Sequence, residues 1–288
     1  MLRTSGLTKE FGGLTAVDDV DFALEEGELC SLIGPNGAGK TTFFNLLTGV
    51  LTPTRGTVEV RREEGGERAG DSRTSSDESD GRWRDVTDAT PYETASIGLH
   101  RSYQITNVFP TSTVLENVRV AAQAASNDAA KLWRNEKAFD EHREEAHRIL
   151  DRVGLADEAD TAAESLSHGA KRQLEVGVAL AGDPDVLLMD EPNAGVSSES
   201  VDRIIDLIED VATDHAVLLV EHNMDIVMNV SDRVVVLNQG AVIAEGTPDD
   251  VRGDPTVQEA YLGGYEAGSL DSDESASDAG KDPEEGTA

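Results

Sequence analysis

A glycine-rich segment near the N-terminus restricts the fold of this chain more than any other feature. Residues 34–42 read GPNGAGKTT and fit the pattern G-x-x-x-x-G-K-[ST]. A predicted strand, Glu28–Ile33, runs directly into this segment. A helix is predicted over Lys40–Leu47, with Gly49 as its C-terminal stop. A strand, a curled glycine loop and a helix in this order are typical of a phosphate-binding loop.

The residue types in the loop explain how it would hold a polyphosphate. Glycines let the backbone curl so that successive N–H groups point inward, and the helix N-terminus adds roughly half a positive charge. Lys40 is predicted to neutralise the β- and γ-phosphates, and the Thr41 hydroxyl to ligate Mg²⁺. The residues expected to contact nucleotide here are Gly34, Asn36, Gly37, Ala38, Gly39, Lys40, Thr41 and Thr42.

Two adjacent carboxylates follow an apolar stretch later in the chain. Val186–Met189 is an uninterrupted apolar run of the kind buried in a parallel sheet, and Asp190 and Glu191 come next. Burying adjacent acids is costly unless a cation or a reaction compensates. We therefore expect Asp190 to hold Mg²⁺ and Glu191 to orient, or take a proton from, the water that attacks the γ-phosphate. Taken without the glycine loop, such a pair is also typical of a helix cap or a surface pair.

Strands and helices alternate along the rest of the chain. Strands are predicted over Leu14–Phe22, Thr57–Val60, Val217–Val220 and Val234–Leu237, and mainly helical segments over Leu115–Val153 and Ser197–Val211. This order predicts an α/β fold with a mostly parallel sheet and helices on both faces. Residues 61–82 lack apolar periodicity and are expected to form a flexible acidic insertion, and 266–288 a disordered acidic tail.

The charge of the chain argues against nucleic acid as a partner. The net charge is −33, with 24 basic against 57 acidic residues, whereas a phosphate-backbone binder needs a basic face. The acidity fits either a solvated surface with a disordered tail or adaptation to concentrated salt. Six lysines against eighteen arginines, and acids spread along the whole chain, favour salt adaptation and hence a halophilic source.

Cysteine content and hydropathy point to the cytosol. Cys30 is the single cysteine, so an intrachain disulfide cannot form, as expected in a reducing compartment. The first twelve residues lack an apolar leader, and no run approaches the roughly 18 apolar residues of a membrane span. Any membrane contact is therefore expected to come through a partner.

These motifs together resemble the nucleotide-binding cassette of ABC transporters. Leu166–Ala170, LSHGA, is similar to the family signature LSGGQ, and Gln104 and His222 match the Q-loop glutamine and the switch histidine. The resemblance implies a P-loop ATPase cassette over 1–265, with a RecA-like parallel core sheet, an antiparallel β edge and a helical signature subdomain. The implied core comprises 1–60, 83–103 and 171–265, and the implied helical subdomain comprises 104–170.

The resemblance also assigns roles to individual residues. It implies ATP and Mg²⁺ as ligands, with Gln104 contacting the metal and His222 holding the γ-phosphate. Phe11 matches the aromatic residue that stacks on adenine. Ser167 and Gly169 match signature residues that face the γ-phosphate bound by a second cassette. Three residues depart from the family pattern, namely His168, Ala170 and Ser197.

Several segments resemble the branched-chain amino acid uptake subfamily more specifically. They are 98–104, 108–110, 113–117, 221–228 and 259–263. The resemblance implies an importer with two ATPase subunits, two membrane permease subunits and an external solute-binding protein, with this chain on the cytoplasmic face of the membrane. Importers of urea and short-chain amides remain an alternative. A non-transport ABC ATPase of DNA repair or ribosomes, or a regulatory nucleotide binder that does not hydrolyse ATP, are alternatives of another class.

Overall fold

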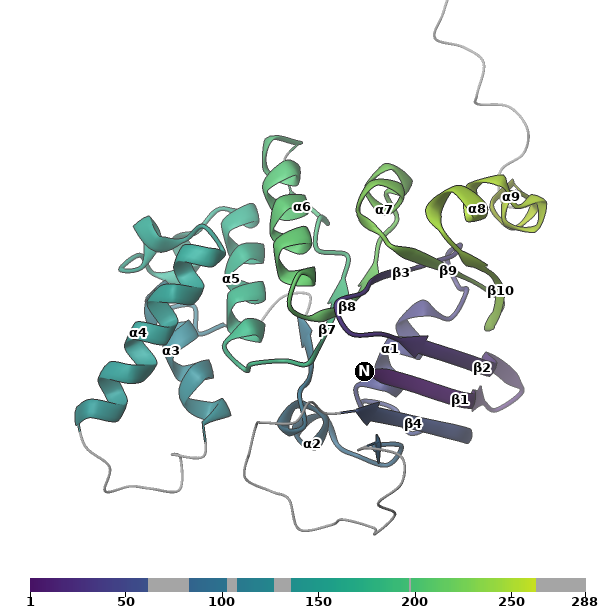
Figure 1. Cartoon of the computed structure of the whole chain (residues 1–288), viewed down its shortest axis with the longest axis horizontal. Helices are drawn as coiled ribbons and strands as arrows, with labels where there is room; N and C mark the ends of the chain where they lie inside the picture. The colour runs from purple at the N-terminus through teal and green to yellow at the C-terminus, as the bar shows by residue number, and fades with distance from the viewer. Residues whose placement is uncertain (62–82, 103–107, 127–135, 197, 263–288) are drawn as a thin grey trace, which may run out of the picture.

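Two β-sheets form the centre of the molecule, and helices surround them (Figure 1). The structure is a computed structural model that describes residues 1–61, 83–102, 108–126, 136–196 and 198–262. Most of the expected insertion, the whole of the expected tail, Gln104 and Ser197 therefore lie outside the described residues.

The larger sheet contains the buried strands that the sequence predicts. In spatial order it consists of β10 (Ala241–Gly246), β9 (Arg233–Asn238), β3 (Leu29–Ile33), β8 (Ala216–Val220), β7 (Val186–Asp190) and β6 (Leu99–Ser102). Strand β10 pairs antiparallel with β9, and the other pairs are parallel. The uninterrupted apolar runs of β3, β7 and β8 are buried almost throughout, as expected for strands covered on both faces.

The smaller sheet is antiparallel. In spatial order it consists of β2 (Leu14–Leu24), β1 (Leu2–Phe11), β4 (Arg55–Arg61) and β5 (Trp83–Asp85). Strand β1 was not predicted, because Thr4 and Thr8 occupy buried positions where apolar residues would reveal a strand pattern. Strand β4 includes Arg61, which pairs with Trp83, so the strand extends one residue into the segment expected to be an insertion.

Helices lie on both sides of the larger sheet (Figure 1). They are α1 (Lys40–Leu47), α2 (Pro91–Ser96), α3 (Val114–Ala125), α4 (Glu136–Arg152), α5 (His168–Leu180), α6 (Ser198–Ala212), α7 (Met224–Val230), α8 (Pro248–Gly253) and α9 (Pro255–Leu262). Short 3₁₀ turns occupy Ala156–Glu158 and Ala163–Ser165. Helix α1 has the predicted bounds. Helix α5 crosses the expected boundary between 170 and 171, so it connects the helical segment to the core.

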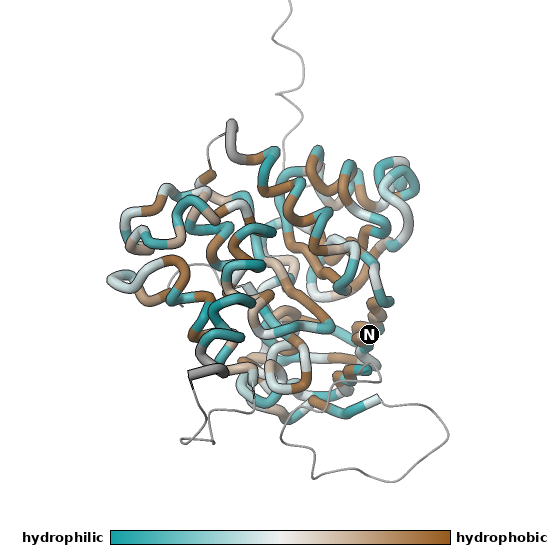
Figure 2. The backbone as a smooth tube through the Cα atoms, turned by 60° about the vertical axis from the view of Figure 1, so that its left-hand side comes forward, coloured by the Kyte–Doolittle hydropathy of each residue, from teal (hydrophilic) through white to brown (hydrophobic). Residues whose placement is uncertain are grey.

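Alternate residues of the central strands enter two different hydrophobic cores. On one face of the larger sheet, Leu187 and Met189 of β7 pack among residues of α5 and α6. On the other face, Leu188 packs with Phe44 of α1 and with the smaller sheet. Because successive strand residues point to opposite faces, one short strand stabilises both layers. Figure 2 shows the same arrangement, with hydrophobic strands inside and helices of alternating hydropathy outside.

A buried ion pair joins three elements at the carboxyl end of the larger sheet. Arg101 of β6 donates from Nη2 to Oδ2 of Asp190 on β7 at 2.6 Å, and the two side chains are 9% and 13% exposed. Its Nη1 donates to Oδ1 of Asn45 on α1 at 2.8 Å, and its guanidinium carbon lies 5.5 Å from the ring centroid of Phe44. Arg101 therefore links the glycine-loop helix to the strand that ends in the acid pair.

Removal of this arginine charge should destabilise the fold. Arg101→Met leaves the Asp190 carboxylate buried without its cation, so we expect the free energy of unfolding to fall by about 3–5 kcal/mol. Urea denaturation followed by circular dichroism measures the change. The matched control is Arg55→Met, whose partner Glu10 lies 3.4 Å away in an exposed pair and should contribute at most about 1 kcal/mol. Equal losses in the two variants would contradict the prediction.

Candidate functional site

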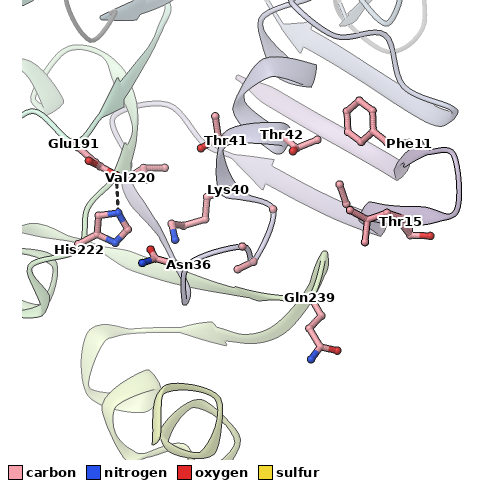
Figure 3. Close-up of a pocket in the computed structure, with 15 residues that line it drawn as sticks. Phe11, Thr15, Asn36, Lys40, Thr41, Thr42, Glu191, Val220, His222 and Gln239 are labelled. Carbon is pink, nitrogen blue, oxygen red and sulfur yellow. Dashed lines mark hydrogen bonds and ion pairs between the residues drawn. The ribbon is translucent and has the colours of Figure 1, made fainter. Parts of the chain in front are cut away.

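The glycine loop between β3 and α1 forms a wall of a pocket of about 740 Å³ (Figure 3). Ten residues predicted from the sequence line it: Phe11, Asn36, Gly37, Ala38, Gly39, Lys40, Thr41, Thr42, Glu191 and His222. Five further residues line it without having been predicted: Leu14, Thr15, Ala16, Val220 and Gln239. In Figure 3 the Glu191–His222 pair lies on one side, Phe11 and Thr15 on the other, and Lys40 between them.

The conformation of the loop requires glycine at two positions. Gly34 and Gly39 have φ angles of 151° and 104°, which other residues rarely adopt. A Cβ atom on Gly34 would lie 2.1 Å from the carbonyl oxygen of Leu237, and one on Gly39 would lie 2.3 Å from that of Ala16. Neither distance is sterically possible, so only glycine at these two positions lets the backbone of β9 and of β2 lie directly against the loop.

The N-terminus of α1 has no side-chain cap among the described residues, and its first turn contains no acid. In α2, α3 and α5, by contrast, Thr90, Thr113 and Ser167 accept a hydrogen bond from a first-turn amide. The first amides of a helix need acceptors, and the helix dipole makes an anion the preferred one. This helix end is therefore suited to a phosphate group.

Lys40 lies inside the loop. Its side chain is 7% exposed, and Nζ donates to the carbonyl oxygens of Gly34 at 2.6 Å and Pro35 at 3.1 Å. Burial lowers the pKa of Lys40, and the nearby carboxylates of Glu191 and Asp190 partly offset this effect. The ammonium group thus lies between the phosphate-binding amides and the two acids.

Glu191 and His222 form a hydrogen-bonded pair at the ends of β7 and β8. Nε2 of His222 lies 2.6 Å from Oε1 of Glu191, as the dashed line in Figure 3 shows. Glu191 has a left-handed backbone with φ of 49°, and its N–H donates to the carbonyl of Val220 at 2.8 Å. Strained backbone at a strand end is a frequent property of reactive residues. The arrangement places a carboxylate and an imidazole in the pocket, and both are side chains that can act as general bases.

The oxygen donors around the loop fit Mg²⁺. Within the described residues, no cluster of three or more His, Cys, Asp or Glu side chains could hold a metal ion. Mg²⁺ usually binds through one or two carboxylates together with substrate phosphates and water, so it needs no such cluster. The Thr41 hydroxyl in the pocket and the Asp190 carboxylate at the end of β7 are donors of this type.

The predicted signature residues lie away from the pocket. Ser167 is exposed at the start of α5, where its Oγ accepts a hydrogen bond from the N–H of Ala170 at 3.2 Å. Gly169 is buried in the first turn of that helix. Of the described residues that line the pocket, none comes from α5. The signature segment therefore presents its helix end to another surface of the molecule.

The C-terminal helix reaches the glycine loop through a residue that the site prediction missed. Burial raises the pKa of the Tyr261 phenol on α9, and the backbone of Gly34 partly opposes that rise. Tyr261 also packs against the apolar cluster that contains Ile33, next to the loop. A signal for this residue was present in the sequence, because 259–263 is one of the subfamily-like segments.

Comparison with known proteins identifies the family. Residues 17–194, more than half of the chain, match the ABC transporter model, and 241–267 match the model described as branched-chain amino acid ATP-binding cassette transporter. The high-affinity branched-chain amino acid transport ATP-binding protein LivG of Escherichia coli strain K12 is 36% identical over 270 residues, covering 91% of this chain and 98% of that protein. The corresponding protein BraF of Pseudomonas aeruginosa is 37% identical with the same coverage.

Solved structures share the fold. A nucleotide-free ATP-binding cassette from an ABC transporter superposes with a TM-score of 0.72 at 30% identity, covering 91% of this chain and 98% of that one. A dimeric bacterial ABC transporter cassette gives a TM-score of 0.67 at 24% identity, covering 86% and 99%. These likenesses confirm the predicted cassette fold. The chain belongs to the ABC transporter family and is an ATP-binding, ATP-hydrolysing cassette of that family.

Proposed function

We propose that this chain supplies the energy of ATP hydrolysis to an importer of branched-chain amino acids. The observation that carries the proposal is the match over residues 241–267, because this segment distinguishes one transporter subfamily whereas the glycine loop is common to many. The nearly full-length similarity to transport ATPases with that substrate supports it. The same C-terminal segment contains Tyr261, which packs against the apolar cluster that includes Ile33, the residue before the glycine loop.

ATP binds along the pocket in this proposal. The amides of the glycine loop and of the uncapped α1 end hold the phosphates, and Lys40 neutralises the β- and γ-phosphates. Phe11, which is 46% exposed at the end of β1, offers its ring to the adenine. Lys9 lies over the same ring, with Nζ 5.1 Å from the centroid. The loop amides, the end of α1 and Lys40 together create a positive field, which attracts the anionic nucleotide although the protein as a whole is acidic.

The two adjacent acids have different roles in this proposal, Asp190 toward the metal ion and Glu191 toward the attacking water. Asp190, Thr41 and Gln104 would hold Mg²⁺, which when bound neutralises charge on the β- and γ-phosphates. Glu191 orients the attacking water and accepts its proton, because its carboxylate enters the pocket on the side of Lys40. His222 fixes the orientation of that carboxylate and contacts the γ-phosphate.

Replacement of the base tests this mechanism. In Glu191→Gln the amide keeps the shape of the side chain but cannot take a proton, so turnover should fall by about a hundredfold or more. ATP affinity, measured with a fluorescent analogue, should remain within about twofold of the wild type, because the phosphate-binding groups are unchanged. Lys40→Ala is the contrasting variant and should lose ATP binding. Near-normal turnover of Glu191→Gln would remove Glu191 from the role of base.

A second cassette completes each site in the proposal. Ser167 is exposed at the start of α5, away from the pocket, and Gly169 lies in the first turn behind it, so this helix end would act on nucleotide bound by the partner cassette. Two permease subunits would anchor the pair to the cytoplasmic face of the membrane, and an external binding protein would deliver the solute. Within the described ranges, no helix is long and apolar enough to cross a bilayer. We further propose the domain division stated above, with 104–170 as the helical subdomain.

Uptake measurements test the proposed substrate. Deletion of the gene in its own cells should abolish the high-affinity uptake of labelled leucine, isoleucine and valine. The wild-type gene should restore uptake, and the Lys40→Ala gene should not, because transport requires ATP binding at the glycine loop. Uptake of labelled urea serves as the control. Loss of urea uptake with unchanged leucine uptake would assign the chain to an amide importer instead.

We propose that the acidic surface adapts the protein to concentrated salt. The net charge is −33, so the acidic side chains should repel one another strongly at about 0.1 M salt, where the Debye length is about 10 Å. At about 1 M salt the Debye length is about 3 Å, and the repulsion should be weak. The melting temperature should therefore rise between these concentrations of KCl, as measured by differential scanning fluorimetry. A melting temperature that is equal or lower in molar KCl would contradict salt adaptation.

A further inference from the structure

A buried carboxylate outside the pocket joins the two loops that carry Glu191 and His222. Glu221 directly follows β8 and is 5% exposed. Its Oε1 accepts hydrogen bonds from the backbone N–H and from the side-chain amide of Asn193, each at 3.2 Å. Its Oε2 accepts a hydrogen bond from the backbone N–H of His222, also at 3.2 Å. One side chain thus binds the backbone of both loops.

These hydrogen bonds hold the backbone close to both Glu191 and His222. Asn193 lies two residues after Glu191, and His222 is itself a member. The loops also meet where the N–H of Glu191 donates to the carbonyl of Val220 at 2.8 Å. The 2.6 Å separation between Oε1 of Glu191 and Nε2 of His222 therefore depends on two loops that the Glu221 carboxylate and this backbone hydrogen bond hold together.

The chemistry of Glu221 suits this task better than an amide or an apolar group would. Burial raises the pKa of Glu221, and the hydrogen bonds from Asn193 and His222 oppose that rise. A buried carboxylate must be matched by donors, and here each oxygen meets at least one N–H group. A glutamine at this position would offer one oxygen and one NH₂ group, and the NH₂ group would face a backbone N–H.

We propose that Glu221 is a positioning residue for ATP hydrolysis, which sets the separation of the loops that carry Glu191 and His222. The inference rests on the proposed function, because it requires that Glu191 and His222 act on water and phosphate. Glu221 is not among the described residues that line the pocket, so its effect reaches the nucleotide through this pair.

The test compares turnover per nucleotide-binding site in the full chain. In Glu221→Gln we expect turnover to fall by about tenfold to a hundredfold, because a displacement near 1 Å has an effect of that size. The dissociation constant of a fluorescent ATP analogue should stay within twofold of the wild type. The matched control is Glu28→Gln, which also removes a hydrogen-bonded carboxylate; that side chain is 14% exposed and accepts from Nε of Arg233 at 2.6 Å. Glu28 precedes β3, at the end opposite the loop, so the control should keep its turnover per site even if its melting temperature falls.

A double variant tests whether Glu221 acts through the pair. Glu221→Gln combined with His222→Ala should turn over no more slowly than His222→Ala, because residues that act as a unit give non-additive losses. If the turnover of the double variant falls by the product of the two single fold-reductions, the inference is overturned. Turnover of Glu221→Gln within twofold of the wild type would overturn it as well.

Two further measurements keep the outcome unambiguous. If Glu221→Gln does not fold, Glu221→Asp retains the charge on a side chain one methylene shorter, and it should bind ATP but lose turnover. Wild-type turnover of Glu221→Asp would then overturn the inference. Glu191→Gln separates the two proposals. If Glu191→Gln is fully active, the base assignment fails, whereas an inactive Glu191→Gln beside a fully active Glu221→Gln overturns the positioning role of Glu221.

Discussion

The site depends on a helix end, the N-terminus of α1, whose amides receive no side-chain cap from the part of the chain that the structure describes. In α2 and α5 the side chains of Thr90 and Ser167 accept a hydrogen bond from a first-turn amide, whereas α1 begins at a glycine in a left-handed conformation. Amides without an internal acceptor and an aligned helix dipole create a local positive field. This field explains how a chain with a net charge of −33 can bind a polyanion, because the attraction arises from the backbone and not from an excess of basic side chains.

The acids near the pocket are stabilised in three different ways. Asp190 pairs with the guanidinium of Arg101, Glu191 meets the imidazole of His222, and Glu221 is surrounded by amide donors. The two less exposed carboxylates, Asp190 and Glu221, have donors on neighbouring elements, while Glu191 lines the pocket beside the imidazole of His222. The distribution keeps negative charge close to the phosphates without leaving it uncompensated in the folded protein.

Patterns within short stretches of sequence predicted the helix and strands that carry the candidate site residues. The elements and residues that were not predicted lack such a pattern or depend on partners far away in the sequence. The bounds of α1 and the apolar strands β7 and β8 follow from short stretches of sequence. Strand β1 was missed because threonines fill buried positions, and β6 has too few residues to show a period. Arg101 and Glu221 were not assigned to the site because their partners lie 89 and 28 positions away. Such contacts exist only once the sheets have formed.

The close approach of two carbonyl groups to the loop has a mechanical consequence. Leu237 belongs to the larger sheet and Ala16 to the smaller one, and each leaves its neighbouring glycine no space for a side chain. A rotation of one sheet against the other must therefore change the curvature of the loop and the spacing of its amides. By reciprocity, an occupant of the loop must favour one angle between the sheets, so nucleotide state and the relative orientation of the two layers form a single equilibrium.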